Sequence, residues 1–396
     1  MFNQALFDPE VARFIRENQN KDIPALILKG SPFSNITIQE IAIQIKGQKV
    51  AKKKFPEFYK TEGIVYPPKL NLEQTSSETT ALYKASLIKG SNAIDLTGGM
   101  GIDSYYISRN FEDFTYCEIN EELAEIAAHN FIQLNANNIL VRPENGIEVI
   151  EKSSGKFSWV YADPARRGEH GGKVFKLEDC EPNIPVKLEM IFKHTENILI
   201  KTSPILDLSA GMEELKWVKE IHIVAVRNEV KELLWILEKG YQDEVVIKTV
   251  NFEKDREQEF SGSINQNTSL SQFSDPQEYL YEPNAAVMKS GMFSQLALNT
   301  GTEKLGQNSH LYTSKEIRSF PGRTFEIIDI KEYKDSGLKK YFKNKKANIT
   351  TRNFPESVEQ IRKKFKIKDG GDEYIFFTIN STGQKIVIFC KKLLSS

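Results

Sequence analysis

AIDLTGGMGID, residues 93–103, joins a short apolar run to a glycine-rich turn. In an α/β sheet the ligand crevice lies outside the carboxyl ends of the strands, and glycines there let a ligand approach backbone that carries no Cβ. A turn that is merely tight would contain the same glycines. The segment is therefore a candidate ligand-binding turn, and the residues around it indicate which ligand.

Around this turn, short apolar runs rich in β-branched residues alternate with helical stretches from about residue 92 to residue 252. Such alternation predicts a doubly wound α/β sheet of seven strands. Leu123, Ala127, Phe131 and Leu134 form one apolar stripe, which predicts an amphipathic helix between the second and third strands. The predicted strands are Ala93–Leu96, Phe114–Cys117, Ile139–Val141, Trp159–Ala162, Ile198–Lys201, Ile221–Val226 and Val245–Val250.

Two acidic residues at strand ends indicate the kind of nucleotide. A dinucleotide site requires G-x-G-x-x-G, but position 104 is Ser instead of the third Gly. Asp95 would repel a phosphate and attract a cationic amine, such as the one in the amino acid part of S-adenosylmethionine. Glu118, after the second strand, can accept hydrogen bonds from both ribose hydroxyls, or it caps the next helix. Together the two carboxylates favour S-adenosylmethionine.

Residues 72–252 resemble the class I S-adenosylmethionine-dependent methyltransferases, which implies a Rossmann-like seven-stranded sheet. DLTGGMGID matches their glycine-rich motif, with Thr97 in place of the usual first Gly, a variant found among ribosomal RNA guanine-N2 methyltransferases. Ser77 lies in a segment that could equally be a capping box, and Glu144 competes with Asn145 for the adenine. The resemblance implies cofactor binding by Ser77, Asp95, Thr97, Gly98, Gly99, Gly101, Asp103, Glu118 and Asn145.

DPARRG, residues 163–168, occupies the strand end at which this family positions the acceptor. Nucleic-acid amino-methyltransferases carry D/N-P-P-aromatic there, whereas this chain has Ala165 and Arg166 after Asp163-Pro164. The motif also resembles the DPPR-x-G of uridine-C5 methyltransferases. Those enzymes need a Cys nucleophile after the fifth strand, where this chain has IKTSP. Covalent pyrimidine chemistry is therefore disfavoured, and Cys180 lies well before that strand.

The expected chemistry is direct methyl transfer, with Asp163, Pro164, Arg166 and Lys201 as catalytic residues. Asp163 would act as hydrogen-bond acceptor or local base, and Lys201 or Arg166 would orient the acceptor, since Arg can stack on a base and bind phosphate. The structural alternative is that Asp163 caps the next helix while Arg166 pairs with a surface acid.

Charge is segregated along the chain. The totals are 53 Lys and Arg against 54 Asp and Glu, a net charge of -1. Residues 321–396 contain 17 basic and 9 acidic residues, a net of +8, which leaves -9 for the remainder. Lysines interleaved with aromatic residues are typical of a surface that binds a polyanion, although a solvated lysine face kept for solubility has the same composition.

These patterns divide the chain into four regions and one linker. Residues 1–70 are predicted to be helical, and residues 71–260 form the methyltransferase-like domain. SGSINQNTSLSQFSDP, residues 261–276, is predicted to be an exposed linker. Residues 276–320 resemble a small ferredoxin-like unit, and residues 321–396 resemble a THUMP-like domain, as in a bacterial family of methyltransferases with that tail. The resemblance implies RNA, either rRNA or tRNA, as partner.

Several classes of protein are disfavoured. Cys117, Cys180 and Cys390 are few and far apart, and the five His are scattered, so neither a disulfide framework nor a metal site is expected. The sequence contains no apolar run of about 18 residues, and a cytoplasmic protein that does not cross a membrane is expected.

The predicted function is methyl transfer from S-adenosylmethionine to a base of structured RNA, with guanine N2 as the expected acceptor. The alternatives are a catalytically inactive RNA-binding protein that retains the fold, and a methyltransferase for a protein or a small molecule.

Overall fold

The computed structural model describes residues 2–68, 72, 75–166, 176–264, 273–334, 336–343 and 345–393, and at Arg166 it describes the backbone alone. The chain forms two compact units. The first comprises Met1–Lys219 and Leu234–Gln242, and the second comprises Glu220–Leu233 and Asp243–Ser396.

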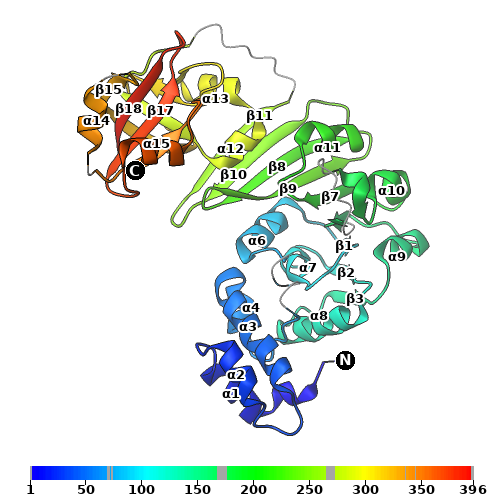
Figure 1. Ribbon diagram of the computed structural model, residues 1–396. Coiled ribbons are helices and arrows are strands. Elements are labelled where there is room, and N and C mark those ends of the chain that lie inside the picture. Colours follow the sequence, from blue (N-terminus) through cyan, green and yellow to red (C-terminus); the bar gives the residue numbers. More distant parts are fainter. Residues whose placement is uncertain are drawn as a thin grey trace. The chain divides into compact units, whose positions relative to one another are not determined.

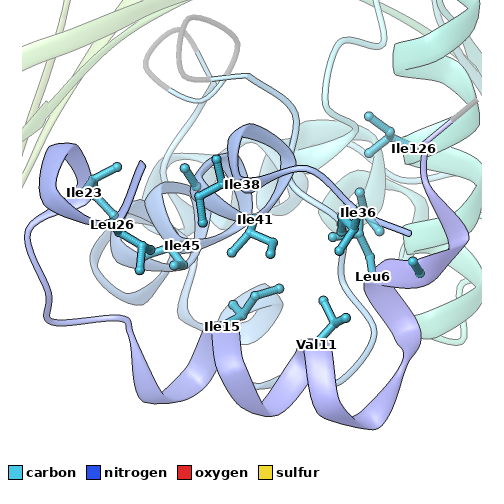
Figure 2. Packing of buried hydrophobic residues seen from close by; sticks show 13 residues of the cluster. Leu6, Val11, Ile15, Ile23, Leu26, Ile36, Ile38, Ile41, Ile45 and Ile126 are labelled. Carbon is cyan, nitrogen blue, oxygen red and sulfur yellow. The ribbon is translucent and has the colours of Figure 1, made fainter. Parts of the chain in front are cut away.

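The first unit begins with short helices that pack around one apolar cluster. A capping box starts the long helix α3, because Thr37 Oγ1 accepts from the amide of Glu40 at 3.2 Å and the Glu40 carboxylate accepts from the amide of Thr37 at 2.8 Å. Figure 2 shows Val11 and Ile15 of α1 pointing toward α3. The elements are η1 (Gln4–Phe7), α1 (Pro9–Glu17), α2 (Ile23–Lys29), α3 (Ile38–Lys54) and α4 (Pro56–Lys60).

Strands in the order β7-β4-β1-β2-β3 form the centre of the first unit (Figure 1). Strands β1, β2, β3, β4 and β7 pair in parallel, so their carboxyl ends share one edge. The elements are α6 (Glu78–Leu87), β1 (Asn92–Asp95), α7 (Ile102–Ser108), β2 (Asp113–Cys117), α8 (Glu121–Gln133), β3 (Ile139–Arg142), α9 (Gly146–Lys152), β4 (Trp159–Ala162), β5 (Ala165–Arg166), η2 (Leu177–Asp179), β6 (Cys180–Glu181), α10 (Ile184–Ile191), β7 (Asn197–Thr202) and α11 (Leu208–Glu214).

All seven predicted strands are present, as β1, β2, β3, β4, β7, β8 (Val218–Val226) and β10 (Val246–Phe252), and the predicted α/β class is confirmed. A further strand, β9 (Glu229–Glu238), follows β8 after a turn in which Arg227 and Asn228 both have positive φ. Such a turn usually carries Asn-Gly, so Arg-Asn gives little signal in the sequence. Consecutive buried residues in β9 also give no alternation that would predict a strand.

In the second unit, β8 pairs in parallel with β10, and β10 pairs antiparallel with β11 (Glu257–Ser263). This unit also contains a seven-stranded sheet with the order β13-β14-β12-β15-β18-β17-β16. The remaining elements are β12 (Tyr279–Pro283), α12 (Ala285–Ser290), α13 (Phe293–Thr300), β13 (Glu303–Lys304), β14 (Tyr312–Ser314), β15 (Gly322–Glu332), α14 (Gly337–Phe342), β16 (Asn348–Thr351), α15 (Val358–Phe365), β17 (Glu373–Ile379) and β18 (Lys385–Lys392).

The predicted boundary at residues 320 and 321 falls inside the seven-stranded sheet. Strand β12 pairs antiparallel with β15, from Tyr279 opposite Glu326 to Pro283 opposite Gly322. Glu282, which is 3% exposed, is bound by Arg323 and by Arg352, the latter at 2.8 Å. The segments before and after residue 321 therefore share a hydrogen-bonded sheet and a buried carboxylate.

Strand β11 extends to Ser263, so the predicted linker at 261–276 is wrong in its first three residues, and residues 265–272 of it lie outside the described part. None of the described helices is both long enough and apolar enough to span a bilayer.

Candidate active site

The glycine-rich turn after β1 is held by packing and by hydrogen bonds. A Cβ at Gly98 would lie 2.2 Å from Cε2 of Tyr116, and Gly101 has φ +81° with Phe131 Cζ 2.6 Å from the position of a Cβ. The Gly98 amide donates to Cys117 O at 2.8 Å, which ties the turn to the end of β2. Beside Gly99, in contrast, the atom nearest to a Cβ would be Thr97 O at 3.8 Å, so this part of the backbone is open to approach.

Asp95, the last residue of β1, is 1% exposed and has local donors on both carboxylate oxygens. Oδ1 accepts from the Thr97 amide at 2.8 Å, and Oδ2 accepts from Ser104 Oγ at 2.5 Å. Burial raises the pKa of Asp95 to about 7, and the bonds from Ser104 and Thr97 counteract only part of this shift. In this arrangement Asp95 organises the turn. Oδ1 also accepts from Thr97 Oγ1, so only Oδ2 keeps a further lone pair for a ligand.

Thr97 joins the ends of two strands. Its Oγ1 accepts from the amide of Asp163 at 2.7 Å and donates to Asp95 Oδ1 at 3.1 Å. Asp163 directly follows β4, the neighbour of β1 in the sheet. A glycine at position 97 would lack the hydroxyl, so the departure from the usual motif has a structural consequence. The hydroxyl fixes the first residue of DPARRG against the glycine-rich turn.

Glu118, at the end of β2, accepts from two backbone amides. Oε2 accepts from Gly99 at 2.8 Å, and Oε1 accepts from Asn120 at 2.8 Å. The cap of α8 is Asn120, whose side chain accepts from Leu123 at 3.0 Å. Asn120, and not Glu118, therefore caps this helix. The Glu118 carboxylate lies against the open glycine.

Asp163 forms an ion pair with Lys201 of β7. The Lys201 side chain is 13% exposed, and that of Asp163 is 36% exposed, so solvent reaches the acid more than the amine. Pro164 is buried, and β5 follows it, paired with β6. The expected alternative in which Asp163 caps a following helix is wrong, because a strand stands there. The side chain of Arg166 and residues 167–168 lie outside the described part.

A cluster of charged and hydroxyl side chains surrounds Asp103, near the same end of the sheet. Asp103 Oδ2 accepts from Ser76 Oγ at 2.7 Å and from Tyr161 OH at 2.8 Å, and Lys84 Nζ lies 3.2 Å from Oδ1. Burial acts to raise the pKa of Asp103, but Lys84, Lys201 and the two hydroxyl donors hold it below its ordinary value. The Lys84 side chain is fully buried.

The sequence reasoning missed Ser76 and Lys84. A signal for Lys84 was available, since it follows Thr80 and Ala81 at helical spacing on the buried face of α6. A lysine on an apolar face is rarely buried without an acidic partner, and such a partner is Asp103. The hydroxyl of Ser76 had no comparable signal, because its partner lies 27 residues away.

Two predicted cofactor contacts are helix caps in the structure. Ser77 Oγ accepts from the Thr80 amide at 3.2 Å and caps α6, and Asn145 Oδ1 accepts from the Ile147 amide at 2.9 Å and caps α9. Asn145 also lies beside the turn, because a Cβ at Gly146 would be 2.4 Å from Leu96 O. The structure therefore brings Asn145 to the glycine-rich turn.

Among the residues that the structure describes, no three His, Cys, Asp or Glu side chains converge as metal ligands would.

A pH-dependent loss of stability is expected from Asp95. Because its pKa is raised from 3.8 to about 7, the folded state holds a proton that the unfolded chain has lost. The unfolding free energy should therefore fall as pH rises from about 4 to about 7, on the order of 1 kcal/mol per pH unit at most, and stay level above that. Asp95→Asn keeps an acceptor for Thr97 and should abolish this dependence.

Urea unfolding followed by tryptophan fluorescence between pH 5 and 8 measures this difference. Trp159, Trp217 and Trp235 are the three tryptophans of the chain, and all lie in the first unit. Parallel stability curves for the wild type and Asp95→Asn would contradict the buried titration.

Family models match the C-terminal part of the chain. A ferredoxin-like domain matches residues 279–321, and a THUMP domain-like model matches residues 322–392. A comparison with curated proteins finds no match. Among solved structures, a "putative RNA methyltransferase" from Pyrococcus horikoshii is 15% identical, with a TM-score of 0.34 over 48% of this chain and 98% of its own. A "putative methyltransferase" from Streptococcus mutans is 14% identical, with a TM-score of 0.31 over 40% of this chain and 96% of its own.

The similarity to one solved structure extends over the whole chain. A "putative methyltransferase" from Porphyromonas gingivalis W83 is 30% identical, with a TM-score of 0.88, and the match covers 100% of both chains. The chain therefore belongs to the family of this Porphyromonas gingivalis protein.

Proposed function

We propose that the protein is an S-adenosylmethionine-dependent methyltransferase that modifies a base of structured RNA by direct transfer. The observation that supports this most strongly is the Thr97 hydroxyl bridge, which places the Asp163–Lys201 pair next to an open glycine turn. Guanine N2 is the proposed methyl acceptor, because an exocyclic amine has an N–H that can donate a hydrogen bond to a carboxylate.

The residues of the turn suit the proposed cofactor. Gly99 leaves backbone uncovered, and the Glu118 carboxylate beside it can accept from ribose hydroxyls while it holds the Gly99 amide. Asp95 offers a buried carboxyl group to an amine, and Asn145 has an amide group at the edge of the turn. Ser77, Thr97, Gly98, Gly101 and Asp103 complete the proposed set by shaping this edge. The bound cofactor supplies a methyl group on a sulfonium, which is a good leaving group.

Asp163 is the proposed acceptor-binding residue. Its carboxylate would accept a hydrogen bond from the substrate N–H and so align the nitrogen lone pair, while its backbone is fixed by Thr97. Lys201 pairs with the same carboxylate and keeps its orientation. After transfer the methylated nitrogen loses its proton readily, so no stronger base is required. Pro164 and Arg166 would shape the acceptor side.

The basic segment supports RNA as the substrate. In the described part of the second unit, seven exposed lysines on and near α14 and α15 have no ion-pair partner: Lys339, Lys340, Lys343, Lys346, Lys363, Lys366 and Lys368. In contrast, Lys345 and Lys364 pair with Glu373 and Glu356. Unpaired lysines are available to phosphates, and a lysine face kept only for solubility would bind RNA no better than other surface lysines. An RNA substrate also agrees with the expected cytoplasmic location.

The test is methyl transfer from labelled S-adenosylmethionine into total RNA from a strain that lacks the gene, followed by nucleoside mass spectrometry. The purified wild type should label RNA as N2-methylguanine, and Asp163→Asn should lose roughly a hundredfold in rate. Asp163→Asn should still bind S-adenosylhomocysteine in calorimetry. Binding of S-adenosylhomocysteine without RNA labelling would favour a protein or small-molecule acceptor, and no binding would favour an inactive RNA-binding protein.

Thr97 provides a sharper test of the site. Thr97→Val removes the hydroxyl at nearly constant volume and leaves the Asp163 amide without its acceptor. Methyl transfer should fall roughly tenfold or more in kcat, with little change in S-adenosylhomocysteine affinity. Thr97→Ser, which keeps the hydroxyl, should retain most of the rate. Equal rates for the Val and Ser variants would show that the bridge does not position Asp163.

The lysine surface gives an independent prediction. Replacement of Lys363, Lys366 and Lys368 by Ala in the full chain should weaken binding to total tRNA and reduce the dependence of affinity on salt. The matched control replaces three exposed lysines of the first unit, at positions 89, 187 and 193. Filter binding at several salt concentrations compares the two. An equal loss in both triple variants would indicate a general charge effect.

A further inference from the structure

The N-terminal helical region encloses a cavity that the proposed active site does not use. Its volume is about 420 Å³, within the range of small-ligand pockets. Residues of η1, α1 and α3 and the segment 59–66 line it. Leu6 and Ile15, which line the cavity, also belong to the apolar cluster shown in Figure 2.

Amide and phenol groups form one wall of this cavity. Gln19 Nε2 donates to Gln48 Oε1 at 2.5 Å, and Tyr59 OH donates to Gln19 Oε1 at 3.3 Å. Gln44, which also lines the cavity, has both amide atoms bound to the Tyr66 backbone, at 3.0 and 2.9 Å. The Gln48 amide nitrogen has no such partner among the described residues, so its N–H groups are available to a ligand.

The rim of the cavity carries positive charge. Arg16 and Lys60 are exposed, line the cavity and form no ion pair within the described part of the chain. The lining contains one acid, Glu62, and the described N-terminal residues 2–68 have ten Lys and Arg against seven Asp and Glu. The balance favours an anionic ligand.

We infer that this cavity binds a single unpaired nucleotide of the RNA substrate, an inference that rests on the proposed function. The Gln48 and Gln19 amides match the donor and acceptor groups on the edge of a base, and Tyr59 offers a ring face on which a base stacks. Arg16 and Lys60 suit the flanking phosphates. A free phosphate would use the two cations but not the amide wall.

The experiment uses the full chain and a five-nucleotide single-stranded RNA with 4-thiouridine at its centre. Ultraviolet crosslinking and peptide mass spectrometry locate the central base. We expect crosslinks to Tyr59 or its neighbours in the segment 59–66. Arg16→Ala and Gln48→Ala should each lower the crosslink yield there roughly fivefold.

Arg13 offers a matched control. It is an exposed arginine on α1 like Arg16, it has no ion-pair partner among the described residues, and it does not line the cavity. Arg13→Ala should change the yield less than twofold. Equal yields for the Arg13 and Arg16 variants, or crosslinks confined to residues 321–393, would overturn the inference.

The methyl-transfer assay on the same variants separates this inference from the proposed function. RNA labelling without crosslinks at the cavity would overturn the nucleotide site and leave the methyltransferase standing. Crosslinks at the cavity that respond to Arg16→Ala, in a protein that labels no RNA, would retain the site and overturn the enzyme. Thermal unfolding of each variant checks that the fold is intact, which is expected because Arg16 is exposed and Gln48 is only partly buried.

Discussion

The arrangement of the candidate site depends on one hydroxyl group, Oγ1 of Thr97. It accepts from the Asp163 amide and donates to Asp95, so the ends of β4 and β1 are joined across the sheet. Parallel pairing alone fixes the strands, but the residues beyond the last pair are free to diverge. The hydroxyl extends the order of the sheet into both loops, and the Asp163–Lys201 pair then has one position relative to the glycine-rich turn. The hydrogen bonds that order these loops are therefore made by residues that themselves belong to the site.

The two acidic residues beside the glycine-rich turn need partners that compensate for the loss of solvent. Asp95 is buried and the Asp103 side chain is 11% exposed, and two unpaired carboxylates there would cost several kcal/mol each. The two carboxylates have different hydrogen-bond and ion-pair partners. Asp103 is compensated by Lys84 and two hydroxyl donors, whereas Asp95 has neutral donors only. One acid therefore stays ionised, and the other has a pKa near neutrality, although they lie on consecutive elements.

Much of the first unit could be predicted from sequence, because its strands are short apolar runs and its turn carries glycines that packing demands. Strand β9 could not, since its consecutive buried residues show neither alternation nor a strong turn signal. At the site, Asp163 and Lys201 could be singled out from their positions at strand ends, and the structure pairs them. The bond from Ser76 to Asp103 could not be predicted, because a hydroxyl that reaches a distant carboxylate leaves no periodic pattern.

The strand pairing between β12 and β15 limits where this chain can be divided into independent segments. Family models divide the tail between residues 321 and 322, yet this boundary crosses a ladder of five residue pairs and the carboxylate of Glu282. A fusion that transplanted residues 322–392 alone would present β15 with an unpaired edge and leave Arg323 and Arg352 without their acid. The two matched segments, 279–321 and 322–392, are therefore expected to stay together in any rearrangement of the chain that leaves the sheet intact.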